Sequence, residues 1–376
     1  MVDIHRLMIA GAGAGKTTFL VRKLLETEGF SLITTFTVKN AEEIKRKIRE
    51  INKGAIPNNI DVLTWDSMLI RHGIKPFLKT ITDRRVSGMR MVTCQEDGAP
   101  KWARSDSIDY YMTSSGLLYS DKLANLSCKC DERTSGLVID RLTKCYRQIF
   151  IDEAQDLTGY DFEFIKKLID QDNAWILMTC DPRQTTYNTH FDRKNKKYND
   201  GHIDSYIKDT CSEERCLLDN TTLNKSYRCR QEICSFSSKL YEDEYPEVES
   251  RALYESTGHD GVFLVRSEDV DNYLKRYSDA LQIRESRKTK VNENYPVLNM
   301  GESKGTTFNR ILVYPTADML KWIGNNTTQL KPRTKSKFYV ALTRARYSVA
   351  IVCKDDKLYN REVPGVQKWR EEFKRS

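Results

Sequence analysis

The sequence predicts an α/β protein of two lobes, each built on a parallel, doubly wound sheet. Three observations support this fold class. Strands alternate with helices along most of the 376 residues, which is typical of parallel sheets joined by right-handed crossovers. A glycine-rich turn joins the first strand to the first helix, and a later buried strand ends in two acids. The length allows two domains, each with its own core.

The composition excludes several classes of protein. Hydrophobic residues make up 39% and aromatic residues 10% of the chain, which argues against disorder. No apolar run approaches the roughly 18–20 residues that cross a bilayer, so we expect no membrane partner. We also expect no secretory leader, because the first apolar stretch runs into the glycine-rich turn. Ten cysteines then predict reduced thiols in a cytoplasmic protein. The net charge of +8 suits a polyanion without identifying one.

The first lobe is predicted to span residues 1–72 and 146–190, with a small inserted lobe at 73–145, where periodicity is poor. Residues 191–376 are predicted to form the second lobe, and the polar stretch 191–215 is interpreted as its boundary loop. The expected strands are 4–10, 32–36, 61–63, 147–151, 174–180, 262–265, 310–314 and 348–352. Two helices are expected to begin directly after residues 17 and 64. Four others are expected at 40–50, 158–170, 229–242 and 268–285.

The turn AGAGAGKT, residues 10–17, has the pattern of a phosphate-binding loop in which Ala replaces the first Gly. Small residues let consecutive backbone N–H groups turn toward phosphate oxygens at a helix N-terminus. Lys16 would reach the β- and γ-phosphates, and Thr17 would hold Mg²⁺. The alternative is a flexible turn, but the flanking strand and helix favour nucleotide binding. The predicted binding residues are Ala10, Gly11, Ala12, Gly13, Ala14, Gly15, Lys16, Thr17 and Thr18.

Two acids, Asp152 and Glu153, end the strand at 147–151. Adjacent residues at a strand end point in different directions. Asp152 can therefore hold Mg²⁺ while Glu153 polarises the attacking water. Acids commonly end strands, so this pair alone is a moderate signal. It indicates a catalytic site because the same chain also has a phosphate-binding loop. Together the two features predict hydrolysis of a nucleoside triphosphate.

Eight segments resemble the motifs of superfamily 1 helicases of the UvrD/Rep/PcrA type, in the family's order. They are AGAGAGKT (10–17), TFTVKNAEEI (35–44), VLTWDSM (62–68), IFIDEAQD (149–156), CDPRQTTY (180–187), NKSYRCRQEI (224–233), GESKGTTF (301–308) and YVALTRAR (339–346). The resemblance implies two RecA-like lobes, with ATP and Mg²⁺ as cofactors. It implies that Gln184 senses the γ-phosphate, that Arg228 and Arg344 stabilise charge on the transferring phosphoryl group, and that Tyr227 stacks on adenine.

The same resemblance implies a single-stranded DNA track, followed from 3′ to 5′. Such a track needs cationic groups and flat rings rather than sequence readout, so an RNA track stays open. Among the candidates, Phe36 and Trp65 could equally be core residues at strand ends. Lys39 and Lys304 could be solvated charges. The candidate track residues are Thr35, Phe36, Lys39, Thr64, Trp65, Tyr187 and Lys304.

Some features depart from the family pattern. The upstream glutamine motif is expected to be missing, since nine residues precede Ala10, and Cys180 replaces a Gly. Only 76 positions separate Arg228 from Lys304, so the accessory lobe called 2B is expected to be absent. A second hypothesis is therefore a DNA-sensing ATPase subunit of a nuclease-containing repair or antiviral complex. A weaker signal is the spacing of Cys211, Cys216, Cys229 and Cys234, which leaves a metal site as a minor alternative to buried thiols.

Overall fold

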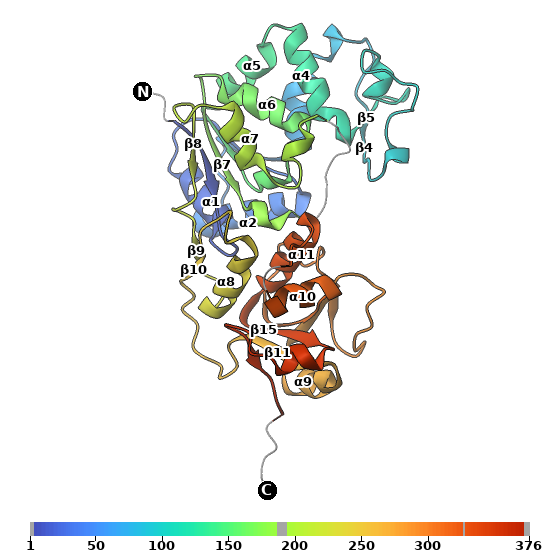
Figure 1. Ribbon diagram of the computed structural model, residues 1–376. Helices are drawn as coiled ribbons and strands as arrows, with labels where there is room; N and C mark the ends of the chain where they lie inside the picture. Colours follow the sequence, from blue (N-terminus) through green and yellow to red (C-terminus); the bar gives the residue numbers. More distant parts are fainter. Residues whose placement is uncertain (1–3, 186–193, 326–327, 372–376) are drawn as a thin grey trace. The chain divides into compact units, whose positions relative to one another are not determined.

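The computed structural model describes residues 4–185, 194–325 and 328–371. The chain divides into two compact units (Figure 1). The first unit comprises Met1–Ile9, Lys16–Pro182 and Asn188–Asp219, and the second comprises Ala10–Gly15, Arg183–Tyr187 and Asn220–Ser376. Among the described residues, every helix is too short or too polar to cross a lipid bilayer.

The first unit contains a six-stranded parallel sheet in the order β3-β2-β6-β7-β1-β8. Its strands are β1 (His5–Ile9), β2 (Ser31–Thr35), β3 (Ile60–Thr64), β6 (Gln148–Ile151), β7 (Trp175–Cys180) and β8 (Cys216–Asp219). Its helices are α1 (Lys16–Leu25), α2 (Val38–Ile51), α3 (Trp65–Met68), α4 (Leu123–Arg133), α5 (Leu137–Cys145), α6 (Tyr160–Ile169) and α7 (Ile203–Thr210). The parallel, doubly wound sheet predicted for this part of the chain is confirmed.

The sequence explains these elements locally. All five residues of β2 are buried, as expected for a strand that has neighbours on both sides and is covered on both faces. The charged helix α2 buries Ala41, Ile44 and Ile48 on one face. Thr37 caps its N-terminus by accepting a hydrogen bond from the Asn40 amide at 3.1 Å. Because β6, β7 and β1 are neighbours, the residues that follow their carboxyl ends come together at one edge of the sheet.

Two stretches differ from the sequence prediction. The insertion 73–145 was expected to be irregular, but it contains α4 and α5, and α4 packs against α5 and α6 (Figure 1). The insertion also contains two short strands, β4 (Gly88–Arg90) and β5 (Leu117–Tyr119), which pair with each other in parallel, apart from the six-stranded sheet. The stretch 191–215 was expected to be a boundary loop, but it contains α7. The following strand, β8, pairs with β1, so the first unit continues to Asp219.

The second unit contains another six-stranded parallel sheet, in the order β13-β12-β14-β15-β11-β16. Its strands are β11 (Gly261–Arg266), β12 (Ala280–Arg284), β13 (Val297–Asn299), β14 (Phe308–Tyr314), β15 (Ala345–Cys353) and β16 (Gln367–Lys368), and β9 (Lys225–Ser226) pairs separately with β10 (Glu249–Ser250). Its helices are α8 (Gln231–Ser238), α9 (Val270–Arg276), α10 (Ala317–Asn325), α11 (Pro332–Leu342) and α12 (Asp356–Asn360).

The helix predicted over 268–285 is wrong in its second half. Helix α9 ends at Arg276, and residues 280–284 form β12, which pairs with both β13 and β14. Ala280, Leu281 and Ile283 are buried there. A short apolar run fits either a buried helix or a central strand, and the long-range pairing decided between them.

Candidate nucleotide-binding site

The glycine-rich loop lies between β1 and α1, as predicted. Gly13 and Gly15 adopt positive φ angles of 76° and 77°, a region that glycine enters without steric cost. A Cβ atom built at Gly15 would meet nothing within 4 Å. Lys16 and Thr17 form the first turn of α1, so their amides lie at the positive end of the helix dipole. The loop therefore has the backbone of an anion cradle.

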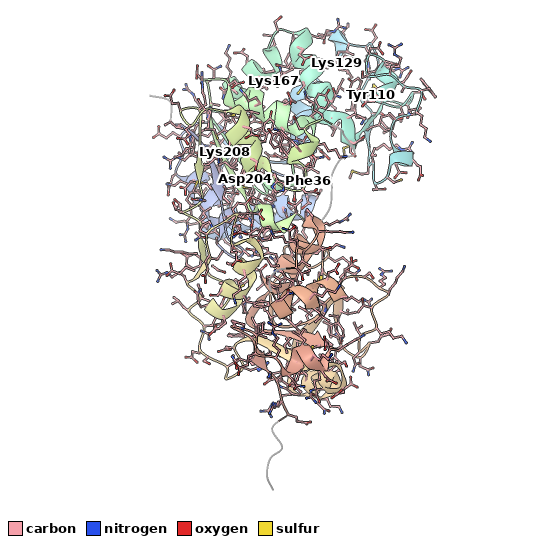
Figure 2. All side chains as sticks on the ribbon, viewed as in Figure 1. Phe36, Tyr110, Lys129, Lys167, Asp204 and Lys208 are labelled. Carbon is pink, nitrogen blue, oxygen red and sulfur yellow. The ribbon has the colours of Figure 1, made fainter. Side chains whose placement is uncertain are left out.

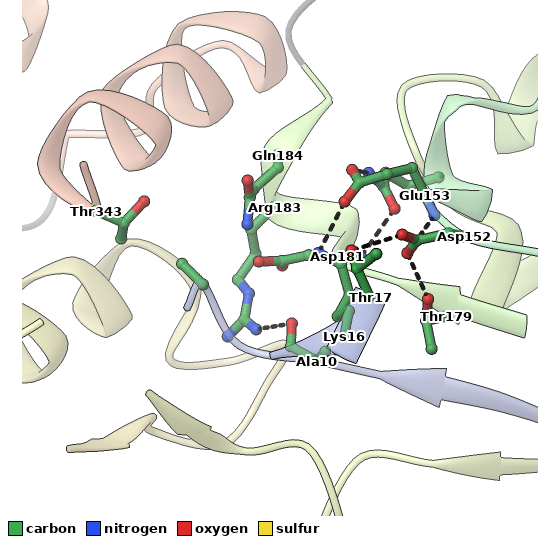
Figure 3. Close-up of polar contacts among 12 residues, drawn as sticks. Ala10, Lys16, Thr17, Asp152, Glu153, Thr179, Asp181, Arg183, Gln184 and Thr343 are labelled. Carbon is green, nitrogen blue, oxygen red and sulfur yellow. Dashed lines mark hydrogen bonds and ion pairs between the residues drawn. The ribbon is translucent and has the colours of Figure 1, made fainter. Parts of the chain in front are cut away.

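The two predicted acids follow the carboxyl end of β6 and contact the first turn of α1 (Figure 3). Asp152 accepts hydrogen bonds from the hydroxyls of Thr17 at 2.7 Å and Thr179 at 2.8 Å. The Lys16 ammonium pairs with a Glu153 carboxylate oxygen at 3.3 Å. All four predicted phosphate-site side chains, Lys16, Thr17, Asp152 and Glu153, are thus brought together within the first unit.

Burial shapes the electrostatics of this cluster. Asp152 is 3% exposed, and burial, together with the charge of Glu153, raises the pKa of its carboxyl group. Lys16 and the two hydroxyl donors oppose that rise. A cation placed beside Asp152 would favour the ionised carboxylate further.

The oxygen atoms at Thr17 and Asp152 fit a magnesium ion. Mg²⁺ prefers hard oxygen ligands and usually takes one or two from the protein, with the rest from water and phosphate. A hydroxyl and a carboxylate 2.7 Å apart, at the end of a phosphate loop, supply that donor set. The fit to Mg²⁺ is therefore argued from the kind of oxygen atoms that Thr17 and Asp152 supply.

Glu153 is held in an unusual backbone conformation. Its φ angle is 57°, in the left-handed region that costs a non-glycine residue free energy. The fully buried Gln155 donates from its amide to the Glu153 carboxylate and accepts from the Asp181 backbone N–H at 2.9 Å. Sequence reasoning missed Gln155 and Thr179 as supports, although both lie within or beside predicted motifs.

The second unit brings three predicted residues together. Arg344 is 1% exposed and donates from Nη2 to Gln184 Oε1 at 3.1 Å and to the Thr343 hydroxyl at 3.2 Å. Arg228 donates from Nη1 to the Thr343 carbonyl at 3.1 Å. The two arginines and the glutamine predicted to sense phosphate therefore form one connected group around Thr343. The sequence indicated each residue separately but not this connection.

Tyr227 has the geometry that base stacking requires. Its side chain is 59% exposed, so the ring is accessible. Its backbone N–H donates to the carbonyl of Gly13 at 3.0 Å, and this bond holds the residue beside the phosphate loop. The predicted contact with adenine stays a prediction.

The candidate nucleic-acid residues divide into buried and accessible groups. Trp65 is 1% exposed, donates to Asp161 and packs edge-on against Phe164. This burial contradicts the predicted role in the track and supports the core alternative. Thr35 is also 1% exposed, so its side chain is not accessible to a strand.

Four other track candidates have accessible surface. Phe36 follows β2 and is half-buried (Figure 2). Thr64 is half-buried too, and it caps α3 by accepting from the Ser67 amide at 3.2 Å. Lys39 is exposed, and Lys304 is half-buried. Tyr187 lies outside the described residues.

The four cysteines considered as metal ligands belong to different units. Cys211 and Cys216 lie in the first unit, and Cys229 and Cys234 lie in the second. Within the residues that the structure describes, no group of three or more His, Cys, Asp or Glu side chains is placed to hold a metal ion. Cys216, Cys229 and Cys234 are buried free thiols.

A phosphate loop after β1 and an acid pair after β6, two strands that both pair with β7 in one parallel sheet, define the fold and site of a P-loop nucleoside triphosphatase. Residues 112–353 match the family model of the viral superfamily 1 RNA helicase core domain, and residues 2–88 match that of the UvrD/REP helicase N-terminal domain. The first match covers more than half of the chain. The chain therefore belongs to the superfamily 1 helicases, as its motifs predicted.

Three of the solved structures to which this chain is similar are helicases. They are the arterivirus nonstructural protein 10 helicase alone (14% identity, TM-score 0.46, covering 94% of this chain and 61% of that chain) and in complex with DNA (13%, 0.46, 94% and 62%), and the PRRSV helicase (13%, 0.44, 96% and 55%). This chain thus spans between 55% and 62% of the length of these helicases. A search of curated protein sequences gives no match.

Proposed function

We propose that this chain hydrolyses ATP and couples hydrolysis to movement along single-stranded nucleic acid. The observation that carries the proposal is the cluster at the phosphate loop, where Lys16 contacts Glu153 and Thr17 contacts Asp152. A lysine and two acids gathered at a helix N-terminus supply the groups for binding a triphosphate and activating water.

Each residue of the cluster has a separate role in this proposal. The loop amides and Lys16 bind phosphate oxygens. Glu153 accepts a proton from the attacking water, and its amide partner Gln155 orients the carboxylate. Thr17 and Asp152 would hold Mg²⁺, which supplies charge neutralisation for the phosphates when bound.

We propose that Arg228 and Arg344 of the second unit make hydrolysis depend on their contact with the bound nucleotide. Guanidinium groups stabilise charge that develops on the transferring phosphoryl group. Arg344 contacts Gln184, so we propose that the two respond together to the γ-phosphate. Arg228 shares the partner residue Thr343, so its position depends on the same segment.

For the track, we propose single-stranded DNA followed from 3′ to 5′, as the resemblance to the UvrD/Rep/PcrA type implies. The description of the longer family match favours RNA as a second candidate. Stacking and phosphate contacts serve either strand, because discrimination depends on contacts to the 2′-hydroxyl. The nuclease-containing complex has no support in the family or structural matches and stays an untested alternative.

The test is the ATPase rate of the chain alone and with single-stranded DNA, single-stranded RNA or duplex DNA. We expect several-fold stimulation by single-stranded DNA and faster displacement of a block at the 5′ end than at the 3′ end. Stimulation by RNA alone would assign the track to RNA. If neither single-stranded DNA, single-stranded RNA nor duplex DNA changes the ATPase rate, the proposed coupling of hydrolysis to movement is overturned.

Two variants test the site itself. Lys16→Ala and Glu153→Gln are expected to abolish turnover, because one removes the phosphate-binding cation and the other the base. Matched controls are Lys23→Ala on the same helix and Glu50→Gln on α2, since both side chains are exposed. A wild-type rate in either site variant would end the assignment.

A further inference from the structure

Arg183 is a buried cation beside the phosphate loop that no motif role explains. Its side chain is 2% exposed, although it precedes Gln184 in a short 3₁₀ turn. Its Nη2 donates to the carbonyl of Ala10 at 2.8 Å, and this bond is drawn in Figure 3. A charged group this deeply buried requires partners. The Ala10 carbonyl, at the start of the loop, is one of them.

Two tyrosine rings of the second unit surround the same guanidinium group. The centroids of Tyr245 and Tyr339 lie 5.3 Å and 5.2 Å from Arg183 Cζ. Both distances are within the range of cation–π attraction, which is stronger for desolvated groups. Tyr339 lies on α11 and is 1% exposed, so its ring has a fixed position.

The hydroxyl of Tyr339 makes a second contact with the loop. It accepts a hydrogen bond from the backbone N–H of Ala12 at 3.3 Å. Ala10 and Ala12 are therefore each bonded to one of two side chains that also contact each other. All of these residues belong to the second unit.

The loop needs such anchors because its own residues are small. Alanine and glycine have no side chains with which to order the backbone, and glycine loses more conformational freedom than any other residue on ordering. Two backbone bonds also restrain the loop, from Gly11 N–H to the Leu223 carbonyl at 2.9 Å and from Tyr227 N–H to the Gly13 carbonyl at 3.0 Å. Arg183 and Tyr339 restrain the loop through their side chains, so a substitution can remove either contact without altering the amino-acid sequence of the loop itself.

We propose that Arg183, Tyr339 and Tyr245 position the phosphate loop for nucleotide binding. The inference rests on the proposed ATPase function. The three residues are positioning residues: Arg183 and Tyr339 hold Ala10 and Ala12, and Tyr245 contacts the Arg183 guanidinium group. The amides that follow and Lys16 then bind phosphate without first being ordered. Because binding avoids that ordering cost, their loss weakens nucleotide affinity more than it slows hydrolysis of bound nucleotide.

The test uses the full chain and measures the Kd for ADP, KM and kcat for ATP, and the free energy of unfolding in urea. Tyr339→Phe keeps the ring and removes only the hydroxyl that Ala12 contacts. We expect it to raise Kd and KM about threefold, with kcat within twofold of wild type and unfolding unchanged. Arg183→Met should raise Kd about tenfold or more, and Arg183→Lys should recover part of that loss because it keeps a cation.

Controls separate the outcomes. Arg361→Met, at an exposed position of the second unit, should leave Kd unchanged. If wild type binds ADP, Lys16→Ala does not, and Tyr339→Phe and Arg183→Met both bind like wild type, the positioning role is overturned and the ATPase proposal stands. If Arg183→Met lowers stability while the folded fraction binds ADP with wild-type Kd, Arg183 serves only the core. If wild type binds no nucleotide, both proposals fail.

Discussion

The indole Nε1–H of Trp65 donates to Asp161 Oδ1 at 2.7 Å, and this bond joins the start of α3 to the start of α6. The ring also packs edge-on against Phe164 with centroids 5.9 Å apart. Asp161 uses its other oxygen to accept from the Thr158 amide at 3.1 Å. A tryptophan that was predicted to contact nucleic acid thus serves the core of the first unit.

Replacing Trp65 should therefore affect stability rather than nucleic-acid binding. We expect Trp65→Phe to lower the free energy of unfolding by about 1–3 kcal/mol, because it removes a buried hydrogen bond and leaves packing space. Urea denaturation measures this loss. Trp102→Phe, at a 71% exposed tryptophan, is the control. A large fall in single-strand affinity with unchanged stability would show that Trp65 belongs to the track after all.

Phe36 is expected to behave in the opposite way. It is half-buried after β2, so a base can stack on its accessible surface. Phe36→Ala should weaken single-strand affinity by about 1–3 kcal/mol, the usual contribution of one stacked base. Fluorescence anisotropy with a labelled oligonucleotide measures the change. Phe30→Ala, at an exposed phenylalanine of the same unit, should bind normally. Equal affinities for the two variants would remove Phe36 from the track.

Asp66 makes stability depend on pH. Burial, together with the charge of Asp161, raises the pKa of Asp66 to about 7, and its Oδ1 is buried without a hydrogen-bond partner in the described part of the chain. The folded state therefore binds a proton more tightly than the unfolded state, whose carboxyl has a pKa near 3.8. This group favours folding below its unfolded pKa, and the contribution is lost as pH rises toward 7.

Asp66→Asn should mimic the protonated form. We expect the variant to be more stable than wild type by roughly 1–3 kcal/mol at pH 8, with the difference shrinking toward pH 4. Urea titrations at the two pH values measure it. Asp83→Asn, at an exposed aspartate, should give no comparable pH-dependent gain. A constant difference between pH 4 and pH 8 would contradict the assignment to Asp66.

Arg344 should act mainly on the rate of hydrolysis. We expect Arg344→Lys to lower kcat by about 10²-fold or more, with a smaller change in the Kd for ADP, because an arginine that stabilises charge on the transferring phosphoryl group acts chiefly on the transition state. Lysine keeps the charge but cannot reproduce the bonds to Gln184, Thr343 and the Val340 carbonyl. Single-turnover rates and ADP titration separate the two effects. A proportional loss of affinity and rate would indicate a role in binding instead.

Some features followed directly from the order of residues. The phosphate loop at 10–17 and the acids at 152–153 are local patterns, and the sheet brings them together because β1 and β6 both pair with β7. The eight motifs also predicted the superfamily that the family models confirm. Local periodicity described α2 and α6 within about two residues, because each has a clear apolar face.

The tertiary structure decided what local patterns leave open. Residues 280–284 form a strand because β13 and β14 pair with them, and residues 216–219 join the first sheet because β1 accepts them at its edge. Trp65 is buried because Asp161, 96 positions away, supplies its hydrogen-bond acceptor. Arg183 lies against the loop because two tyrosines, from positions 245 and 339, surround it. The order of residues determined which chemical groups are present. Burial and pairing between distant segments decided which of them face a ligand and which hold the core, because both depend on free energies that no local window contains.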